Sequence, residues 1–193
     1  LYLREDYSHR LLDQLKSGEL DFAIIALPYK TEDLITNTLF KDEFWWVTKK
    51  GMALAKSKEI SIKDVNLNDL LLLEEGHCLR NHTIEACGTQ AVNSMNESFA
   101  ATSLYTLLQM VDNGLGSTLL PEMVLKSGAL LGTDLVARPF SHKPPYREIA
   151  LLRRKTDNRK TDFELLSALI VSEKKRYSSQ LGALRSKRAT TRR

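Results

Sequence analysis

Hydrophobic residues recur near the start of the chain at two spacings, one typical of helices and one typical of buried strands. Residues 7–16 predict a helix, because three leucines share one face and Gly18 follows as a C-cap. Residues 20–27 are a nearly continuous apolar run that ends at Pro28, which is typical of a strand buried on both faces in a parallel sheet. Because residues 1–5 alternate apolar and polar positions, the chain opens strand–helix–strand and indicates an α/β fold.

The same two spacings alternate over the rest of the chain. Strands are predicted at the apolar and aromatic runs 43–48, 70–73, 95–99, 116–120, 135–138 and 148–152. Helices are predicted at 104–111 after a cap at Thr102 or Ser103, at 122–126, and at 161–175 with Phe163, Leu166, Leu169 and Ile170 inward. Ser61 and Asp64 indicate a capping box for a short helix. Two crossings, near 40–44 and 144–147, predict two lobes.

Composition indicates the class of protein. The chain has 193 residues, of which 42% are hydrophobic and 27% charged, as is typical of a globular protein with its own core. No apolar run has the length of a membrane span, and the N-terminus lacks a signal-peptide pattern. Two cysteines are too few for a disulfide framework, so we expect a cytoplasmic protein without membrane partners, in which any disulfide is transient.

The formal charge of +4 is unevenly divided. The last 20 residues hold eight Lys or Arg and no Asp or Glu, which leaves a net charge of −4 on residues 1–173. A basic tail of this kind can contact nucleic acid or an anionic surface, although a frayed, solvated terminus is the commoner outcome. We therefore expect residues 176–193 to form a basic extension.

Both cysteines, Cys78 and Cys87, lie in one short stretch, nine residues apart. On one continuous α-helix their sulfurs would face opposite sides, about 13 Å apart along the axis. A disulfide needs Cα atoms within about 7 Å, so a bond between them would have to unwind such a helix. The spacing alone does not establish that the two sulfurs meet.

Cys78 follows a predicted buried strand and Gly76, where a helix is expected to begin. Backbone N–H groups and the positive end of a helix dipole stabilise a thiolate there, and His77 and Arg80 add donors or positive charge. A thiolate attacks peroxide, and the resulting sulfenic acid condenses with a second thiol, for which Cys87 is the one candidate. The other interpretation is that both cysteines are small hydrophobic packing residues.

Two other chemistries have weaker support. His77, Cys78, His82 and Cys87 are four potential metal ligands, but their spacings do not match common zinc motifs, and we expect no metal. A cysteine hydrolase would need a distant histidine, such as His142, beside the nucleophile. The chain contains no P-loop, GxGxxG or GxSxG motif, and we expect no cofactor.

The run Gly-His-Cys-Leu-Arg at 76–80, followed by Cys87, resembles the regulatory domain of the OxyR family of peroxide-sensing, LysR-type transcription regulators. The likeness spans about residues 1–175 and also includes Gln14–Asp21, Ala101–Pro121 and Arg147. It implies a two-lobed fold like that of the periplasmic binding proteins. Lobe I would comprise 1–40 and 147–175, and lobe II would comprise 41–146.

The resemblance also implies roles for individual residues. Cys78 would be oxidised by peroxide and would then form a disulfide with Cys87, so that the segment between them refolds. The residues implied to support the thiolate or hold peroxide are His77, Arg80, Arg147 and Ser8, the last where relatives carry threonine. The family's DNA-binding domain, linker helix and first regulatory strand would precede residue 1, so we expect a fragment.

The sequence therefore predicts a regulatory domain and not an enzyme. Oxidation would change how homodimers or homotetramers pair through these domains and would thereby control DNA binding by the missing N-terminal domain. RNA polymerase and a glutaredoxin- or thioredoxin-type reductant are the further partners implied. A small-molecule effector domain with structural cysteines is the first alternative, and a thiol peroxidase is the second.

Overall fold

The computed structural model describes residues 1–87 and 100–190, with the backbone alone for 177–190. The chain divides into two compact units, each built from two stretches of sequence: unit 1 from residues 1–8 and 42–147, and unit 2 from 9–41 and 148–193. The sequence resemblance implied that residues 1–8 belong to the other lobe, and the alternation at 1–5 predicted a strand. Instead, residues 1–7 have no regular structure, and residues 1–8 belong with unit 1. The strand predicted at 95–99 lies outside the described residues.

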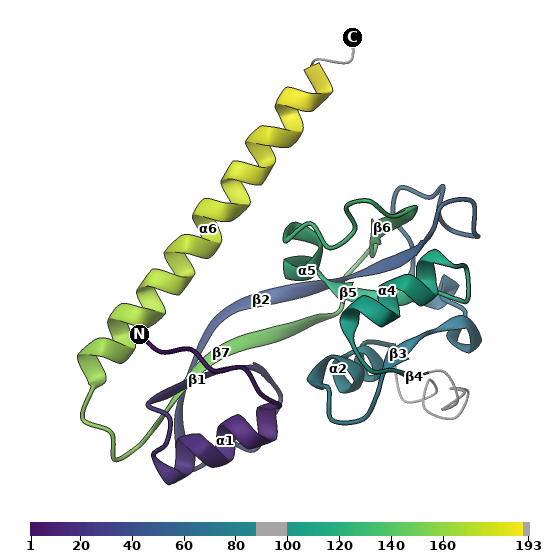
Figure 1. Cartoon of the computed structure of the whole chain (residues 1–193). Helices are drawn as coiled ribbons and strands as arrows, with labels where there is room; N and C mark the ends of the chain where they lie inside the picture. The colour runs from purple at the N-terminus through teal and green to yellow at the C-terminus, as the bar shows by residue number, and fades with distance from the viewer. Residues whose placement is uncertain (88–99, 191–193) are drawn as a thin grey trace. The chain divides into compact units, whose positions relative to one another are not determined.

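Unit 2 is an antiparallel sheet with a helix against each face. Its elements are α1 (Ser8–Ser17, from its second residue on), β1 (Phe22–Leu27), the first half of β2 (Leu34–Lys49), most of β7 (Tyr146–Arg154) and α6 (Lys160–Thr190). Strand β7 pairs antiparallel with β1, with Ala150 opposite Ile25. The side chains of β7 alternate between the two faces of the sheet. Ala150 and Leu152 pack with α1, and Ile149 and Leu151 pack with α6. Figure 1 shows both helices and the strands of this unit.

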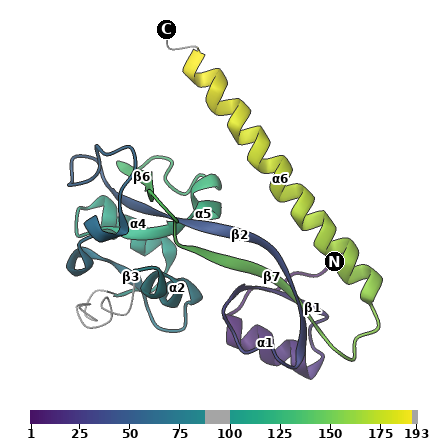
Figure 2. The same cartoon turned by 180° about the vertical axis from the view of Figure 1, so that it is seen from behind.

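Two expectations for unit 2 were wrong. The run at 20–27 is not in a parallel sheet, because β1 lies at the end of the strand order and pairs antiparallel with β7. Ile24 is accordingly 49% exposed. Leu169 of α6 is also not inward but 56% exposed, because α6 packs by one stripe that includes Phe163, Leu166 and Ile170. Figure 2 shows α6 continuing unbroken from the core of unit 2 into the basic segment as far as Thr190.

Unit 1 contains two groups of strands. The second half of β2 pairs antiparallel with β5 (Thr118–Pro121) and β6 (Leu135–Pro139), so that Trp46 lies between Leu119 and Arg138. A short parallel pair, β3 (Leu72–Leu73) and β4 (Ala100–Ala101), lies beside them and is joined to residues before β5 by a bridge between Leu70 and Ser117.

The described helices of unit 1 cover this framework. They include α2 (Cys78–Cys87), α4 (Leu104–Asp112) and α5 (Glu122–Lys126), with short 3-10 turns at Ile62–Asp64 and Leu67–Asp69. The predicted capping box of Ser61 and Asp64 and the predicted cap at Ser103 are both present. Helices α2 and α4 both lie against the β3–β4 pair (Figure 1). None of the described helices combines the length and apolar character that crossing a membrane requires.

Candidate functional site

The two cysteines are the first and last residues of one helix, α2, and both are free thiols. The condition on which the spacing argument depends, that one helix carries both cysteines, is therefore confirmed. Nine residues of rise separate their Cα atoms by about 13 Å along the axis, well beyond the limit of about 7 Å for a disulfide. A bond between Cys78 and Cys87 therefore requires α2 to unwind.

The turn that leads into α2 is set by Gly76. This residue has φ +94, in the left-handed region that glycine adopts without steric cost, and it reverses the chain after β3. The Glu74 N–H donates to the Ala101 carbonyl at 3.0 Å, which holds the end of β3 against β4. The His77 N–H donates to the Glu74 carbonyl at 3.4 Å and closes the turn. As a result, Cys78 begins its helix directly beyond a buried strand.

Two of the predicted supporting residues flank Cys78 and are themselves held. The Arg80 guanidinium donates from Nη1 to the Leu73 carbonyl at 3.1 Å, across the turn. The His77 ring meets the edge of the Tyr7 ring, with centroids 5.3 Å apart and planes at 70°. His77, before Cys78 in the chain, and Arg80, after it, are therefore each held in place by a contact.

Cys87 lies in a different environment, at the edge of a core cluster built around Phe44, Trp46 and Leu119. Burial raises the pKa of the Cys87 thiol from its ordinary value of 9.0 to about 11. At neutral pH this sulfur is therefore protonated and a poor nucleophile until it leaves its packing site.

Arg147 is engaged by a buried carboxylate. Its Nη2 lies 3.0 Å and its Nε 3.2 Å from Oδ2 of Asp42, which is fully buried. The other oxygen of Asp42 accepts the Met123 N–H, at the start of α5, at 3.0 Å. Ser8, the first residue of α1, is buried. His77, Arg80 and the two cysteines thus all lie on α2 or the turn before it, with the cysteines at opposite ends of the helix. Arg147 is paired with Asp42.

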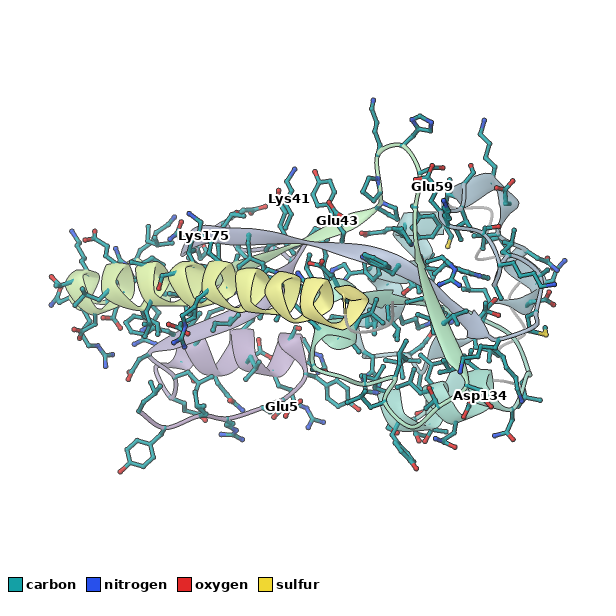
Figure 3. All side chains as sticks on the ribbon, turned by 90° about the horizontal axis from the view of Figure 1, so that it is seen from above. Glu5, Lys41, Glu43, Glu59, Asp134 and Lys175 are labelled. Atoms are coloured by element: carbon teal, nitrogen blue, oxygen red, sulfur yellow. The ribbon has the colours of Figure 1, made fainter. Side chains whose placement is uncertain are left out.

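Sequence reasoning missed Asp42 and Tyr7. A signal for Asp42 exists, since it has the same strand parity as Phe44 and Trp46, both buried. Its neighbour Glu43 is exposed, as Figure 3 shows. No comparable signal marks Tyr7, because its contact is with a residue 70 positions away in the sequence. Of the four potential metal ligands, His77 lies just before α2 and the other three lie along it. Among the described residues, no three metal-ligating side chains come together.

The sequence model of the LysR substrate binding domain matches residues 1–174. The transcriptional regulator EstR of Acinetobacter baylyi is 34% identical over 86% of this chain and 54% of its own length, and the hydrogen peroxide-inducible genes activator of Haemophilus influenzae is 32% identical over 91% and 58%. The chain thus spans a little over half the length of these relatives. The reduced regulatory domain of OxyR2 from Vibrio vulnificus is 36% identical, with a TM-score of 0.79 over 88% of this chain and 79% of that one.

Proposed function

Because the chain belongs to the LysR substrate-binding domain family, with the periplasmic-binding-protein-like fold expected of it, we propose that it is the peroxide-sensing regulatory part of a transcription regulator. In this proposal Cys78 reacts with hydrogen peroxide and then forms a disulfide with Cys87. The observation that carries the proposal is the placement of both thiols at opposite ends of α2. A bond between them can form only by refolding the segment, and that refolding is the signal.

The oxidation proceeds in two balanced steps. The Cys78 thiolate attacks one peroxide oxygen, the O–O bond breaks, and the departing hydroxide takes up a proton to become water. Cys78 is then a sulfenic acid. Next, Cys87 gives up its proton, its sulfur attacks the Cys78 sulfur, and hydroxide leaves as a second water. The two cysteines have lost two electrons, and one peroxide has become two water molecules.

The environment of each thiol fits its place in this order. Cys78 is at the N-terminal end of α2, where backbone N–H groups and the helix dipole favour an anion. His77 precedes it directly, and Arg80 follows two residues later. Cys87 is held protonated by burial in the core cluster, so it does not compete for peroxide. It becomes reactive only once α2 opens. The separation of roles supports Cys78 as the reactive residue and Cys87 as its partner.

In the whole regulator, refolding of the segment would alter the surface through which regulatory domains pair as dimers or tetramers, and so reposition DNA-binding domains. A relative of this chain is named a DNA-binding transcriptional dual regulator, OxyR of Escherichia coli. We propose DNA as a partner reached through such a domain, RNA polymerase as a further partner, a cytoplasmic location, and a cellular dithiol reductant that resets the switch.

A second candidate is a small-molecule effector domain in which the cysteines only pack. The contact of Cys87 with a hydrophobic core cluster favours it, because free cysteines commonly serve as buried small hydrophobic residues. The matched relatives carry the names of regulators, which fits a regulatory domain better than a thiol peroxidase.

The test is to add one equivalent of peroxide to the reduced chain and then record its intact mass, a non-reducing peptide map and its far-UV circular dichroism. We expect loss of two hydrogens, a Cys78–Cys87 cross-link and reduced helical signal. Cys78→Ser should not respond, and Cys87→Ser should stop at a sulfenic acid. If both thiols stay free in the folded wild type, the effector domain becomes the better proposal. Rapid multiple turnover with a reductant would instead indicate a peroxidase.

A further inference from the structure

We infer that Tyr7 is a positioning residue that holds the turn before Cys78 in its reduced conformation and thereby sets how readily the Cys78–Cys87 disulfide forms. The inference rests on the proposed function and assigns part of its regulation to a residue outside the cysteine segment. Tyr7 is also outside the positions that the sequence resemblance singles out.

The contact is made by the ring of Tyr7 with two consecutive residues of the turn. Its edge meets the His77 ring at a centroid distance of 5.3 Å. A Cβ added to Gly76 would lie 3.6 Å from Cε1 of Tyr7, so the ring covers the glycine at ordinary van der Waals distance. Tyr7 therefore packs directly on the two residues that precede Cys78.

Tyr7 is the least exposed of the large hydrophobic side chains in residues 1–8. It is 39% exposed, whereas Tyr2 is 103% and Leu3 89% exposed. Residues 1–8 belong with unit 1, and Ser8 is buried as well. Tyr2 carries the same side chain as Tyr7 but is not buried, so it serves as a control position.

The reduced turn is restrained on both sides of Cys78. The ring of Tyr7 lies on its N-terminal side, and the bond from Arg80 to the Leu73 carbonyl lies on its C-terminal side. Disulfide formation must shorten the separation of the cysteine Cα atoms from about 13 Å to below about 7 Å. Since Cys78 leaves its place at the end of this turn, the contact of Tyr7 with His77 and Gly76 belongs to the dithiol form.

A contact present only in the dithiol form opposes oxidation. Removing it raises the equilibrium constant for disulfide formation by the factor that the contact contributes. Edge-to-face aromatic pairs contribute about two- to tenfold in an equilibrium constant. For a two-electron couple this factor corresponds to a reduction potential lower by about 9–30 mV.

The experiment equilibrates the 193-residue chain in glutathione buffers. One glutathione disulfide is reduced to two thiols for each Cys78–Cys87 disulfide formed, and the oxidised fraction is read after acid quenching. We expect Tyr7→Leu to raise the equilibrium constant about two- to tenfold. Tyr7→Phe keeps the ring and should raise the constant less than Tyr7→Leu does. Tyr2→Leu is the control with an equivalent change at an exposed position and should match the wild type.

A merely structural role predicts a different result. If Tyr7 only supported the fold, Tyr7→Leu would lower the thermal midpoints of the reduced and oxidised chains equally and leave the equilibrium constant unchanged, and the inference would be overturned. We expect the midpoint of the reduced chain to fall and that of the oxidised chain to stay constant. Should Tyr7→Leu not fold, His77→Leu removes the same ring contact from the other side and should raise the constant alike.

The failures of the two proposals are distinguishable in the same titration. A wild-type chain that forms no Cys78–Cys87 disulfide at any glutathione ratio contradicts the proposed function itself. A wild-type chain that forms it, with the same equilibrium constant in Tyr7→Leu, contradicts only the role of Tyr7.

Discussion

Asp42 and Arg147 form a buried ion pair between positions 105 residues apart: Nη2 of the arginine lies 3.0 Å from Oδ2 of the carboxylate. The side chains are 0% and 13% exposed, respectively, so neither charge is well hydrated. Asp42→Asn would leave the guanidinium of Arg147 without its counter-charge. We expect a loss of about 3–5 kcal/mol in the free energy of unfolding, measured with urea.

The matched control for this loss is an exposed pair in the same unit. Lys50 and Asp134 also lie 3.0 Å apart, but their side chains are 59% and 71% exposed. Figure 3 labels Asp134. Asp134→Asn should cost about 0–1 kcal/mol. Equal losses for the two variants would contradict the prediction that the buried charge of Asp42 stabilises unit 1.

Arg80 should stabilise the reduced chain more than the oxidised one. Its hydrogen bond to the Leu73 carbonyl ties α2 to the end of β3, and it requires the helical turn that disulfide formation would unwind. Arg80→Met keeps the stem but not the donor, and we expect it to lower the stability of the reduced chain by about 1–3 kcal/mol. Thermal unfolding of both redox forms checks this. The exposed Arg4, replaced in the same way, should change neither.

The stability of the reduced chain should fall at high pH because of Cys87. Its pKa is raised to about 11, so the folded chain keeps this proton while the unfolded chain loses it near the ordinary value of 9.0. The extra stability is therefore fully present below about pH 9 and is lost as pH rises through about 11.

We expect this loss to be about 1–2 kcal/mol after allowance for partial exposure. The measurement is urea unfolding from pH 8 to 11 for the wild type and Cys87→Ala, under reducing conditions. The difference between the two curves should narrow as pH rises. Parallel curves would show that the thiol of Cys87 is not buried as described.

Gly116 should tolerate no side chain. A Cβ there would lie 2.3 Å from the Asp69 carbonyl oxygen, which accepts the Ser117 N–H at 2.9 Å. Gly116→Ala must therefore separate the backbone segment that leads into β3 from the one that leads into β5, at a cost of about 3 kcal/mol. Gly51→Ala meets nothing within 4 Å and should cost only the backbone strain at φ +89, about 1 kcal/mol. Similar losses in the free energy of unfolding for the two variants would contradict the close approach of Gly116 to the Asp69 carbonyl.

Local patterns in the sequence predicted the parts of the fold that local interactions determine. The cap at Ser103 and the capping box at Ser61 and Asp64 follow from neighbours within a few residues. Periodicity also identified most strands, although β2 extends much further than the predicted 43–48. These elements needed no long-range information.

Contacts between segments far apart in the chain could not be predicted from the sequence patterns. The apolar run at 20–27 looks the same for a parallel and an antiparallel neighbour, because its burial comes from helices on the faces and not from the direction of pairing. The partner of Arg147 likewise lies on another strand. At the site, the spacing of the cysteines predicted that they lie far apart on one helix. The contacts of Arg80 with Leu73 and of His77 with Tyr7 could not be predicted, because they depend on how other segments pack against the turn.

Helix α2 also bears on the lifetime of the proposed intermediate. A sulfenic acid at Cys78 would have to wait for the helix to open before Cys87 could reach it, so the opening rate would compete with capture by small cellular thiols. Asn81, His82 and Thr83, in its middle, are weak helix formers, which favours fast opening. A sequence of strong helix formers at these positions would prolong the intermediate and divert oxidation toward mixed disulfides. The low intrinsic helicity of α2 thus favours the intramolecular product.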